Sequence, residues 1–558
     1  MQGKKLFLDQ EVARFRLSDR VSPHNLYRRL AELVDWSFLY DETRALYSHT
    51  GQPSLDPVVF FKLVLVGRLE NLVSDRRLVE HCALRLDILL FLGYEVDEEL
   101  PWHSTVSRTR QLFPAAVFER LFDHVFAQCV ARGLVAGERQ AVDSAPVKAN
   151  ASLESVQVKQ PAGPPGPRLA TDEPAPLAPA ASVVTAPAHQ LRNLAAHQAR
   201  LVAHSSVPGA QHPKARLLSN KTHYSPADPD ARISVKPGKA RALNYLCSLA
   251  VDTAKGVISH VQADFADSRD SLHLPRLLTG LQRRLRSHEL RLRDLLADAG
   301  YANGANYALL EAQHIRAWIP VFGKYKPDLD GFACDARTDA FTCAEGKTLP
   351  FQKYDTNQDG GWHKIYWAAC RDCQQCPRKP TCAPRARRKQ INRTIYDAAY
   401  RRAWLRQQSR RGQRLRRVRQ GTVEPVFGNL IHHYGLRRLN VRGYAGAHKT
   451  MLLTAVAYNL KKLLKYRPQR QVSAAMVLSR LLLAANRRAG QRNRCPKRPL
   501  GHSRSGYPKM EHHNSSSATA TVILVDTKAS LVITSNGTIM SGFLFNLYSR
   551  FPFTYCLL

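Results

Sequence analysis

The chain has 558 residues, a length typical of two or three domains, and its hydrophobic content of 44% is sufficient for ordinary buried cores. Its 82 Lys and Arg residues exceed its 45 Asp and Glu residues, which gives a formal net charge of +37. Because Arg, the commoner of the two basic residues here, binds phosphate oxygens in pairs, this charge favours nucleic acid as the partner over an acidic membrane surface or a charge that serves solubility alone.

The beginning of the chain, "MQGKKLFLDQEVARFRLSD", lacks the apolar core of a secretory signal. The apolar run "VVFFKLVLVGRLENLV" is interrupted by Lys62 and Arg68, which argues against a membrane span. The eleven cysteines are scattered apart from one cluster, unlike the disulfide framework of a small secreted domain. These features predict a cytoplasmic protein with reduced thiols.

Residues 1–135 carry apolar residues at helical spacing, separated by breakers such as Pro57 and Gly93. A basic helix is expected after Ser104 or Thr105, and it includes Arg108 and Arg110. We interpret this region as a helical N-terminal DNA-binding domain. A helical interaction domain with solvated arginines is nearly as compatible with the pattern.

Residues 136–322 alternate between strand and helix patterns and predict an α/β core. A short strand is expected to end at Asp143, and a hairpin is expected to turn at residues 252–256. A helix, a strand ending at Asp298, another helix and another strand follow. The Pro- and Ala-rich residues 155–215 interrupt this order and are interpreted as an insertion that contains one short polar helix.

Three carboxylates meet the modest requirement for cleaving a phosphodiester with two divalent ions, which need oxygen ligands from strand ends or from a facing helix. They are Asp143, Asp298 and Glu424, the last on a helix expected to begin nearby. Each of them alone is more often a turn residue or a helix cap. Asp252 has good hairpin-turn chemistry and is left outside the site.

The order of these elements resembles the RNase H-like mixed-sheet core of DDE transposases. The stretches "DSAPVKANASLES", "LADAGYANG" and "GTVEPVFGNL" resemble bacterial insertion-sequence transposases, in particular the insertion-sequence 1182 family, over about residues 5–465. This resemblance implies that Asp143, Asp298 and Glu424 are catalytic and bind two Mg²⁺ or Mn²⁺ ions.

The same resemblance implies an activity. The protein would bind the terminal inverted repeats of its element, hydrolyse the DNA, and use the 3′-OH ends to attack target DNA. Double-stranded DNA would therefore be the partner, a homodimer would hold the two ends, and the protein would associate with the bacterial nucleoid. A related nuclease that does not join DNA, or an inactive DNA-binding derivative, is the alternative.

Two positions depart from the pattern of related transposases, which often have an Arg four residues before the Glu and a Lys seven residues after it. Those positions are Gln420 and Ile431 here. Arg419, His432 and His433 are nearby substitutes for phosphate contact. The missing Lys at position 431 favours the inactive alternative somewhat, as does the unusual composition of residues 467–558.

Residues 323–418 are interpreted as a basic insertion domain with a cysteine cluster, "CRDCQQCPRKPTC". Its Cys370, Cys373, Cys376 and Cys382 have paired spacing that suits structural zinc, although four ligands within thirteen residues make a cramped site. Cys334 and Cys343 could complete a different ligand set, and unliganded thiols are the simpler alternative.

A dense Arg run follows the cysteines, with Tyr396, Tyr400 and Trp404 interleaved and Asp397 as its one acid. So unbalanced a run predicts contact with phosphates. The complete set of predicted DNA-binding residues is Arg108, Arg110, Lys148, Arg414, Arg416, Arg417, Arg419, His432, Arg437 and Arg438.

Residues 419–466 are expected to carry the catalytic Glu and complete the core. Residues 467–558 form an irregular basic stretch followed by an apolar, β-prone end. A read-through or frameshifted product, and hence a non-native tail, would account for this composition.

Overall fold

The structure is a computed structural model of the chain. It describes residues 15–48, 54–162, 184–203, 218–234, 240–321, 323, 325–356 and 361–466, and the backbone of 523–526, 529–533 and 539–542. The chain divides into two compact units, Met1–Pro468 and Gln469–Leu558. The second unit contains three short antiparallel strands, β16 (Ile523–Asp526), β17 (Ala529–Ile533) and β18 (Ile539–Gly542). The predicted irregular segment before them lies outside the described residues.

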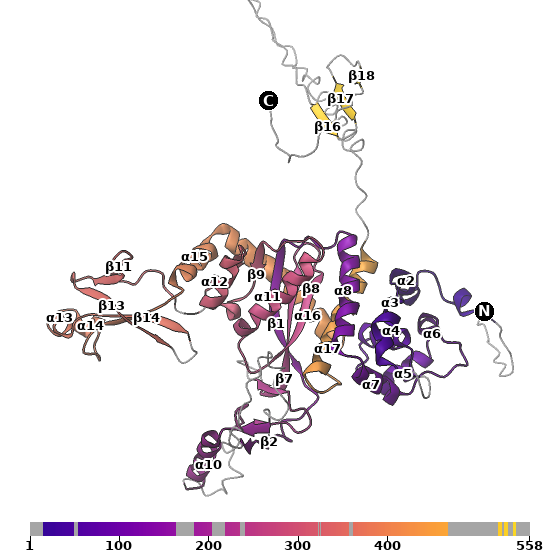
Figure 1. The fold of residues 1–558 in the computed structure, drawn as a ribbon, viewed down its shortest axis with the longest axis horizontal. Helices are drawn as coiled ribbons and strands as arrows, with labels where there is room; N and C mark the ends of the chain where they lie inside the picture. Colours follow the sequence, from indigo (N-terminus) through magenta and orange to yellow (C-terminus); the bar gives the residue numbers. More distant parts are fainter. Residues whose placement is uncertain are drawn as a thin grey trace, which may run out of the picture. The chain divides into compact units, whose positions relative to one another are not determined.

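The N-terminal region is helical, as predicted (Figure 1). The Asp56 side chain caps the central helix α4 by accepting from the Val58 and Val59 amides at 2.7 and 3.0 Å, and most of that helix is buried. The elements are α1 (Leu17–Arg20), α2 (Leu26–Leu33), α3 (Phe38–Thr43), η1 (Arg44–Leu46), α4 (Pro57–Leu69), α5 (Asp75–Ala83), α6 (Leu86–Leu92), α7 (His103–Leu112) and α8 (Ala115–Ala131).

A mixed sheet forms the core, with strand order β10-β9-β1-β7-β6 and with β8 paired to β7. Strands β1, β9 and β10 are parallel, whereas β7 is antiparallel to β1, β6 and β8. The strands are β1 (Arg139–Lys148), β6 (Arg232–Ser234), β7 (Ala242–Asp252), β8 (Ile258–Phe265), β9 (Asp294–Leu296) and β10 (Arg316–Trp318). The helical elements that alternate with them are α11 (Asp270–Arg286), η2 (Ala299–Tyr301) and α12 (Gly304–Ala312).

The predicted hairpin is confirmed as β7 and β8. The carboxylate of Asp252 stabilises the turn between them by accepting hydrogen bonds. It accepts from the backbone amides of Gly137 at 2.7 Å and Ala254 at 2.9 Å, and from Gln140 Nε2 at 2.9 Å. Asp252 is fully buried, so its place outside the site agrees with these contacts.

Two predicted strand ends are wrong. Strand β1 does not end at Asp143 but continues to Lys148, because the residues beyond Asp143 keep pairing with β7 as far as Asn244. Strand β9 ends at Leu296, and Asp298 instead caps η2 by accepting from the Gly300 amide at 3.0 Å.

The Pro- and Ala-rich insertion contains the predicted polar helix, α10 (Ala188–Ala203). Residues 163–183 and 204–217 lie outside the described residues. Short strands flank the helix: β2 (Gln157–Val158), β3 (Gln160–Pro161), β4 (Thr185–Ala186) and β5 (His223–Tyr224).

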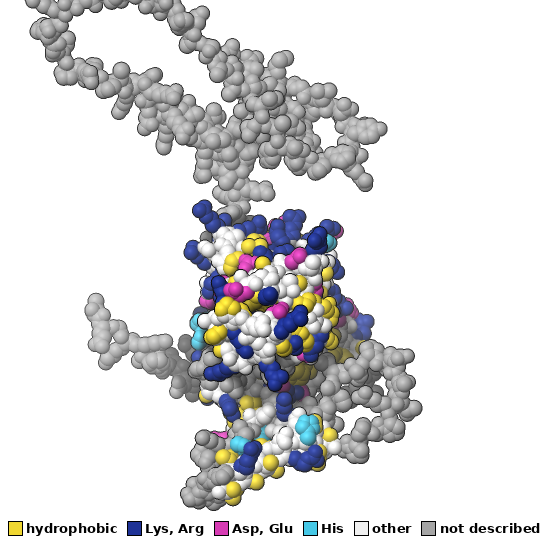
Figure 2. Space-filling model, turned by 90° about the vertical axis from the view of Figure 1, so that its left-hand side faces the viewer, with side chains coloured by type: hydrophobic (Ala, Val, Ile, Leu, Met, Phe, Trp, Pro, Cys, Tyr) yellow, Lys and Arg dark blue, Asp and Glu magenta, His cyan; other side chains and the backbone are white. Residues whose placement is uncertain are grey.

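The basic insertion domain is a five-stranded antiparallel sheet with two very short helices. Figure 2 views the molecule from the side of this domain, where Lys and Arg side chains outnumber Asp and Glu. Its elements are β11 (Phe332–Asp335), β12 (Ala340–Cys343), β13 (Thr348–Thr356), β14 (Trp362–Trp367), α13 (Cys370–Gln374), α14 (Lys379–Cys382) and β15 (Gln390–Thr394).

Three long helices, α15 (Asp397–Gln408), α16 (Arg410–His433) and α17 (Tyr444–Lys465), complete the first unit. Contrary to expectation, Glu424 does not lie near the start of its helix. Helix α16 begins after the Ser409 cap, contains the last part of the Arg run, and accommodates Pro425 in its interior. The predicted domain boundary at residue 418 therefore falls inside a helix. Helix α17 is largely buried and packs against α8, α4 and β8.

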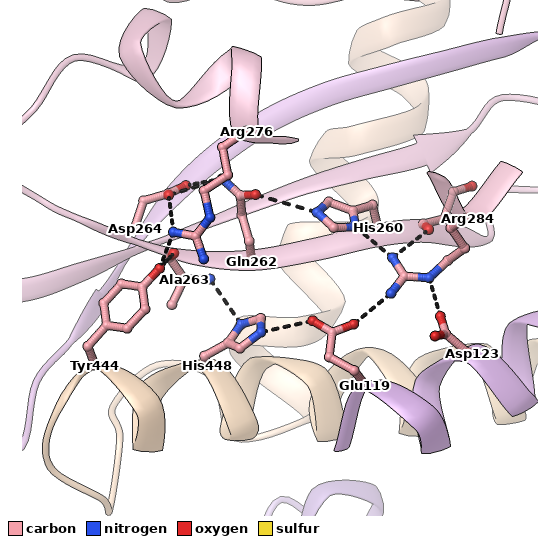
Figure 3. A network of polar contacts seen from close by, with 11 residues as sticks. Glu119, Asp123, His260, Gln262, Ala263, Asp264, Arg276, Arg284, Tyr444 and His448 are labelled. Atoms are coloured by element: carbon pink, nitrogen blue, oxygen red, sulfur yellow. Dashed lines mark hydrogen bonds and ion pairs between the residues drawn. The ribbon is translucent and has the colours of Figure 1, made fainter. Parts of the chain in front are cut away.

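A buried polar network ties α8 to the core (Figure 3). The Arg284 guanidinium, 4% exposed, donates to Glu119 Oε2 at 2.6 Å and to His260 Nδ1 at 2.6 Å, and it also pairs with Asp123. His448 of α17 donates from Nε2 to Glu119 Oε1 at 2.9 Å. The network therefore joins the last N-terminal helix to β8, α11 and α17.

Candidate active site

Asp143 lies in the middle of β1 and pairs with a cation from helix α16. Arg419 donates from Nη2 to Asp143 Oδ2 at 2.8 Å, and the two side chains are 11% and 18% exposed. Burial raises the pKa of Asp143 to about 6 although the Arg419 charge lowers it, and the charges of Asp298 and Asp270 raise it further. The positive charge of Arg419 on α16 thus offsets part of the negative charge around Asp143 on β1.

Asp298 lies just beyond β9, the parallel neighbour of β1, and a third carboxylate accompanies it. A Cβ placed on Gly300 would lie 3.0 Å from Asp298 Oδ1 and 3.2 Å from Asp270 Oδ2. The two carboxylates therefore flank the same glycine, and both act electrostatically on Asp143. Gly300 is needed here because any side chain would crowd these oxygens.

Asp270, the first residue of α11, was missed from the sequence. An Asp in the first turn of a helix usually complements the helix dipole. Its position in the sequence therefore did not indicate a functional site. Asp270 lies near Asp298 only in the folded chain, where both carboxylates are next to Gly300. Gly304 admits the ring of Tyr396, which a Cβ at Gly304 would strike.

Glu424 is exposed on α16 and is not drawn into this group. On a regular helix it lies about 140° around the axis from Arg419, the residue that faces Asp143. It lies one turn beyond Gln420, on the same helical face. Gln420 lines a cavity of about 450 Å³ that also includes Ala297, the residue before Asp298. Glu424 therefore continues the face of α16 that borders the cavity next to Asp298.

The donor chemistry of this site suits a hard divalent cation, since carboxylate oxygens are the ligands that Mg²⁺ prefers. The charges of Asp298 and Asp270 act on Asp143, which pairs with one guanidinium, so the net charge around Asp143 is negative. Within the part of the chain that the structure describes, no three His, Cys, Asp or Glu side chains are close enough together to hold a metal ion. The charge and the ligand type of these residues suit a divalent ion, but their side chains do not form a complete coordination shell in this structure.

The cavity beside the carboxylates is basic. Arg406, Arg416, Arg417 and Arg419 line it together with Trp318 and several Gln side chains. Such a lining suits a nucleic acid, with guanidinium groups for phosphates and an aromatic ring for a base.

Two family models match the chain. A transposase domain (DUF772) matches residues 15–112, and a transposase DDE domain matches residues 342–464. The chain belongs to the insertion-sequence DDE transposases. A search of curated proteins found no match. Glu424 lies within the second matched range of the transposase, whereas Asp143 and Asp298 lie outside both ranges.

Three predicted DNA-binding residues of the transposase lie together at the end of β1. Lys148 accepts from the Leu439 amide at 2.9 Å and donates its own amide to the Arg437 carbonyl at 3.3 Å. This bridge places Lys148 beside Arg437 and Arg438, and all three side chains are exposed. We call these three residues the β1-end basic cluster. Their proximity depends on a contact between segments nearly 300 residues apart.

Arg110 was predicted to contact DNA, but its guanidinium forms two hydrogen bonds of 2.7 Å with Asp75 and is 9% exposed as a residue. This buried pair holds α7 against α5, so Arg110 is not part of an open surface. Arg108 on the same helix is exposed and donates to Ser104 Oγ at 3.3 Å.

The positive charge of the Arg run is partly neutralised by acidic residues from other parts of the fold. Arg402 and Arg406 of α15 both pair with Glu311 of α12, at 2.6 and 2.9 Å. The predicted residues Arg414, Arg416 and Arg417 remain exposed on α16. These three exposed arginines give α16 a positive surface.

The departure at position 431 has a packing reason. Ile431 is half-buried and packs against the main hydrophobic core, where a Lys would lose those contacts. His432 and His433 are exposed on the same turn of α16, and the His432 carbonyl accepts from Asn71 of the N-terminal domain at 3.3 Å. His432 thus remains accessible to a phosphate.

No helix among the described residues of the transposase combines the length and the apolar character that crossing a bilayer requires.

Proposed function

We propose that this transposase binds the terminal inverted repeats of its insertion sequence, cleaves the DNA, and transfers the 3′-OH ends to target DNA. Its motifs resemble those of the insertion-sequence 1182 family, to which we propose that it belongs, and we propose that its mixed sheet is an RNase H-like core. The observation that carries the proposal is that Asp143 on β1 pairs with Arg419 of the Arg-rich helix α16, while Asp298 lies just beyond β9, the parallel neighbour of β1.

We assign Asp143, Asp298 and Glu424 as the ligands of two Mg²⁺ or Mn²⁺ ions. Bound divalent ions would activate the attacking oxygen and stabilise the leaving oxygen. Asp143 and Asp298 supply carboxylates that the sheet holds in place. Glu424, on the cavity-facing side of α16, would complete the set when DNA fills that cavity.

The basic residues have a separate role in this proposal. The exposed arginines of α16 and the β1-end basic cluster would bind phosphates on either side of the scissile bond and fix the register of the duplex. Arg419 holds Asp143 in the metal-free protein and would turn to a phosphate when a metal ion replaces it.

Transposition joins two element ends to one target, so we also propose that the transposase acts as a homodimer on bacterial nucleoid DNA. The molar mass of the complex with end DNA, measured by light scattering, tests the stoichiometry.

The function is tested with pre-cut DNA ends that carry free 3′-OH groups, incubated with plasmid and Mg²⁺. Insertion of the ends into the plasmid is the expected result. Nicking of intact ends without insertion would instead indicate a nuclease of the same fold. Binding without either reaction would indicate the inactive derivative, which Ile431 and the unusual composition of residues 467–558 favour as the second candidate.

A further inference from the structure

The insertion domain has too little hydrophobic core for its size. Its buried core consists of Phe341, Leu349, Tyr366, Ala368 and Ile391. Small modules with so few buried residues are usually stabilised by a metal ion or by disulfides.

Apolar packing explains little of why the two short helices of this domain form. Helix α13 has five residues and α14 has four, and neither contains a buried residue. Isolated helices of this length are not stable in water. Apolar burial in the segment between β14 and β15 is limited to small side chains such as Ala368 and Ala383, so a further stabilising interaction is expected there.

Four thiols lie around the place where these helices join the sheet, although their sulfur atoms are not gathered closely enough there to hold a metal ion. Cys343, Cys376 and Cys382 line one cavity of about 290 Å³, together with Lys389. Cys373 reaches the same place, because its Sγ accepts the Lys389 amide at 3.4 Å. Cys343 and Cys373 also pack against the same small core.

The backbone around these thiols forms tight turns of the kind that present Cys ligands. Cys343 lies where β12 turns into β13, and its carbonyl accepts from the Gly346 amide at 2.9 Å, with Gly346 at a φ of +71°. Cys373 and Cys376 belong to one C-x-x-C turn, in which the Cys376 amide donates to the Cys373 carbonyl at 3.4 Å. A hairpin Cys, a C-x-x-C pair and one further Cys supply four ligands from three directions.

We propose that Cys343, Cys373, Cys376 and Cys382 form a structural zinc site. Tetrahedral Zn²⁺ takes four thiolates, and its binding stabilises a domain directly. All four thiols are free and half-buried, and the proposed site requires their side chains to turn toward the cavity when zinc binds. Lys389 and Arg378, which line the cavity, would offset the negative charge of a tetrathiolate site.

This set differs from the one that the sequence spacing suggested, because Cys343 replaces Cys370. Cys370 begins α13 and lines neither the cavity nor the small core, and Cys334 is exposed on β11. Cys343 lies 30 residues before Cys373 in the chain, so only the fold reveals it as a partner. The proposal is independent of the transposition activity.

The test measures zinc in the full-length transposase, purified under reducing conditions without chelators. One zinc per chain is expected by elemental analysis. Cys343→Ser and Cys382→Ser should release zinc at a chelator concentration at least about tenfold lower than the unaltered chain, because loss of a ligand costs more than loss of a supporting contact. Cys370→Ser and Cys334→Ser are matched controls and should retain zinc like the unaltered chain.

A second readout avoids dependence on folding of the variants. Replacement of zinc by Co²⁺ in the unaltered chain should give the intense visible absorption of tetrahedral thiolate coordination. Absence of bound zinc together with absence of that spectrum on titration with Co²⁺ would overturn the proposal. So would zinc loss from Cys370→Ser with full retention in Cys343→Ser.

Discussion

Arg419→Gln is the substitution whose effect the structure defines best. It removes the cation that pairs with Asp143 at 2.8 Å, while the other charges near Asp143, those of Asp298 and Asp270, are both negative. Breaking a buried pair by removing one partner costs about 3–5 kcal/mol. Since the two side chains are 11% and 18% exposed rather than fully buried, we expect the lower end, about 3 kcal/mol.

The same substitution should increase the response to metal. In the unaltered protein a divalent ion competes with the Arg419 guanidinium for Asp143, whereas in Arg419→Gln it does not. A ligand that binds the folded state stabilises it in proportion to the logarithm of its concentration over its Kd. The variant should therefore be stabilised more by Mn²⁺ than the unaltered protein is.

Urea unfolding with EDTA and with Mn²⁺ measures both effects. Arg417→Gln, an exposed position on the same helix, is the control and should change the free energy of unfolding by no more than about 0.5 kcal/mol. If Arg419→Gln matched this control in EDTA, or if Mn²⁺ stabilised both variants equally, the assigned role of the Arg419–Asp143 pair would be wrong.

Three further predictions concern other parts of the molecule. Burial would raise the pKa of Glu119, but the His448 hydrogen bond and the Arg284 charge outweigh it and lower the pKa to about 2. The folded pKa is thus below the usual value of 4.5, so about 3 kcal/mol of stability should be present above pH 4.5 and lost as pH falls toward 2. Urea midpoints across that range should slope less steeply in Glu119→Gln; equal slopes would contradict the assignment. Asp270→Asn should raise the Mn²⁺ concentration for half-maximal DNA cleavage about tenfold through loss of a nearby negative charge. An unchanged concentration would remove Asp270 from the site. Replacing Arg437 and Arg438 together by Gln should weaken binding to all DNA sequences and reduce the salt dependence by about two counterions, as measured by fluorescence anisotropy at several salt concentrations. A slope equal to that of the unaltered protein would exclude the pair from DNA contact.

Local patterns predicted the elements that depend on local chemistry. The β7–β8 hairpin follows from two apolar runs around a turn with Asp252 and Gly256, and the α10 helix follows from its spacing. The extent of β1 could not be predicted, because its residues after Asp143 are held by pairing with a strand about a hundred residues away.

Helix α16 was misjudged because its sequence carries signals that usually start a helix. Gly421 and Thr422 followed by Pro425 suggest a boundary. Tertiary packing overrides them, since Val423, Val426 and Phe427 are buried in the core.

From the sequence, candidate site residues could be proposed only where residue type and motif point to them. Asp143, Asp298 and Glu424 carry such motifs. Asp270 and Cys343 do not, because each becomes a candidate only through distant parts of the chain that the fold brings beside it. Arg110 was misjudged for the same reason, since its partner Asp75 lies 35 residues away.

The most direct test of the account is Mg²⁺-dependent cleavage of end DNA by Asp298→Asn and Glu424→Gln, with Asp328→Asn, an exposed carboxylate of the insertion domain, as the control. The first two variants should bind end DNA with unchanged affinity and lose cleavage by at least about a hundredfold, while the control cleaves normally. Normal cleavage by Asp298→Asn or Glu424→Gln would contradict the assignment of that residue to the active site.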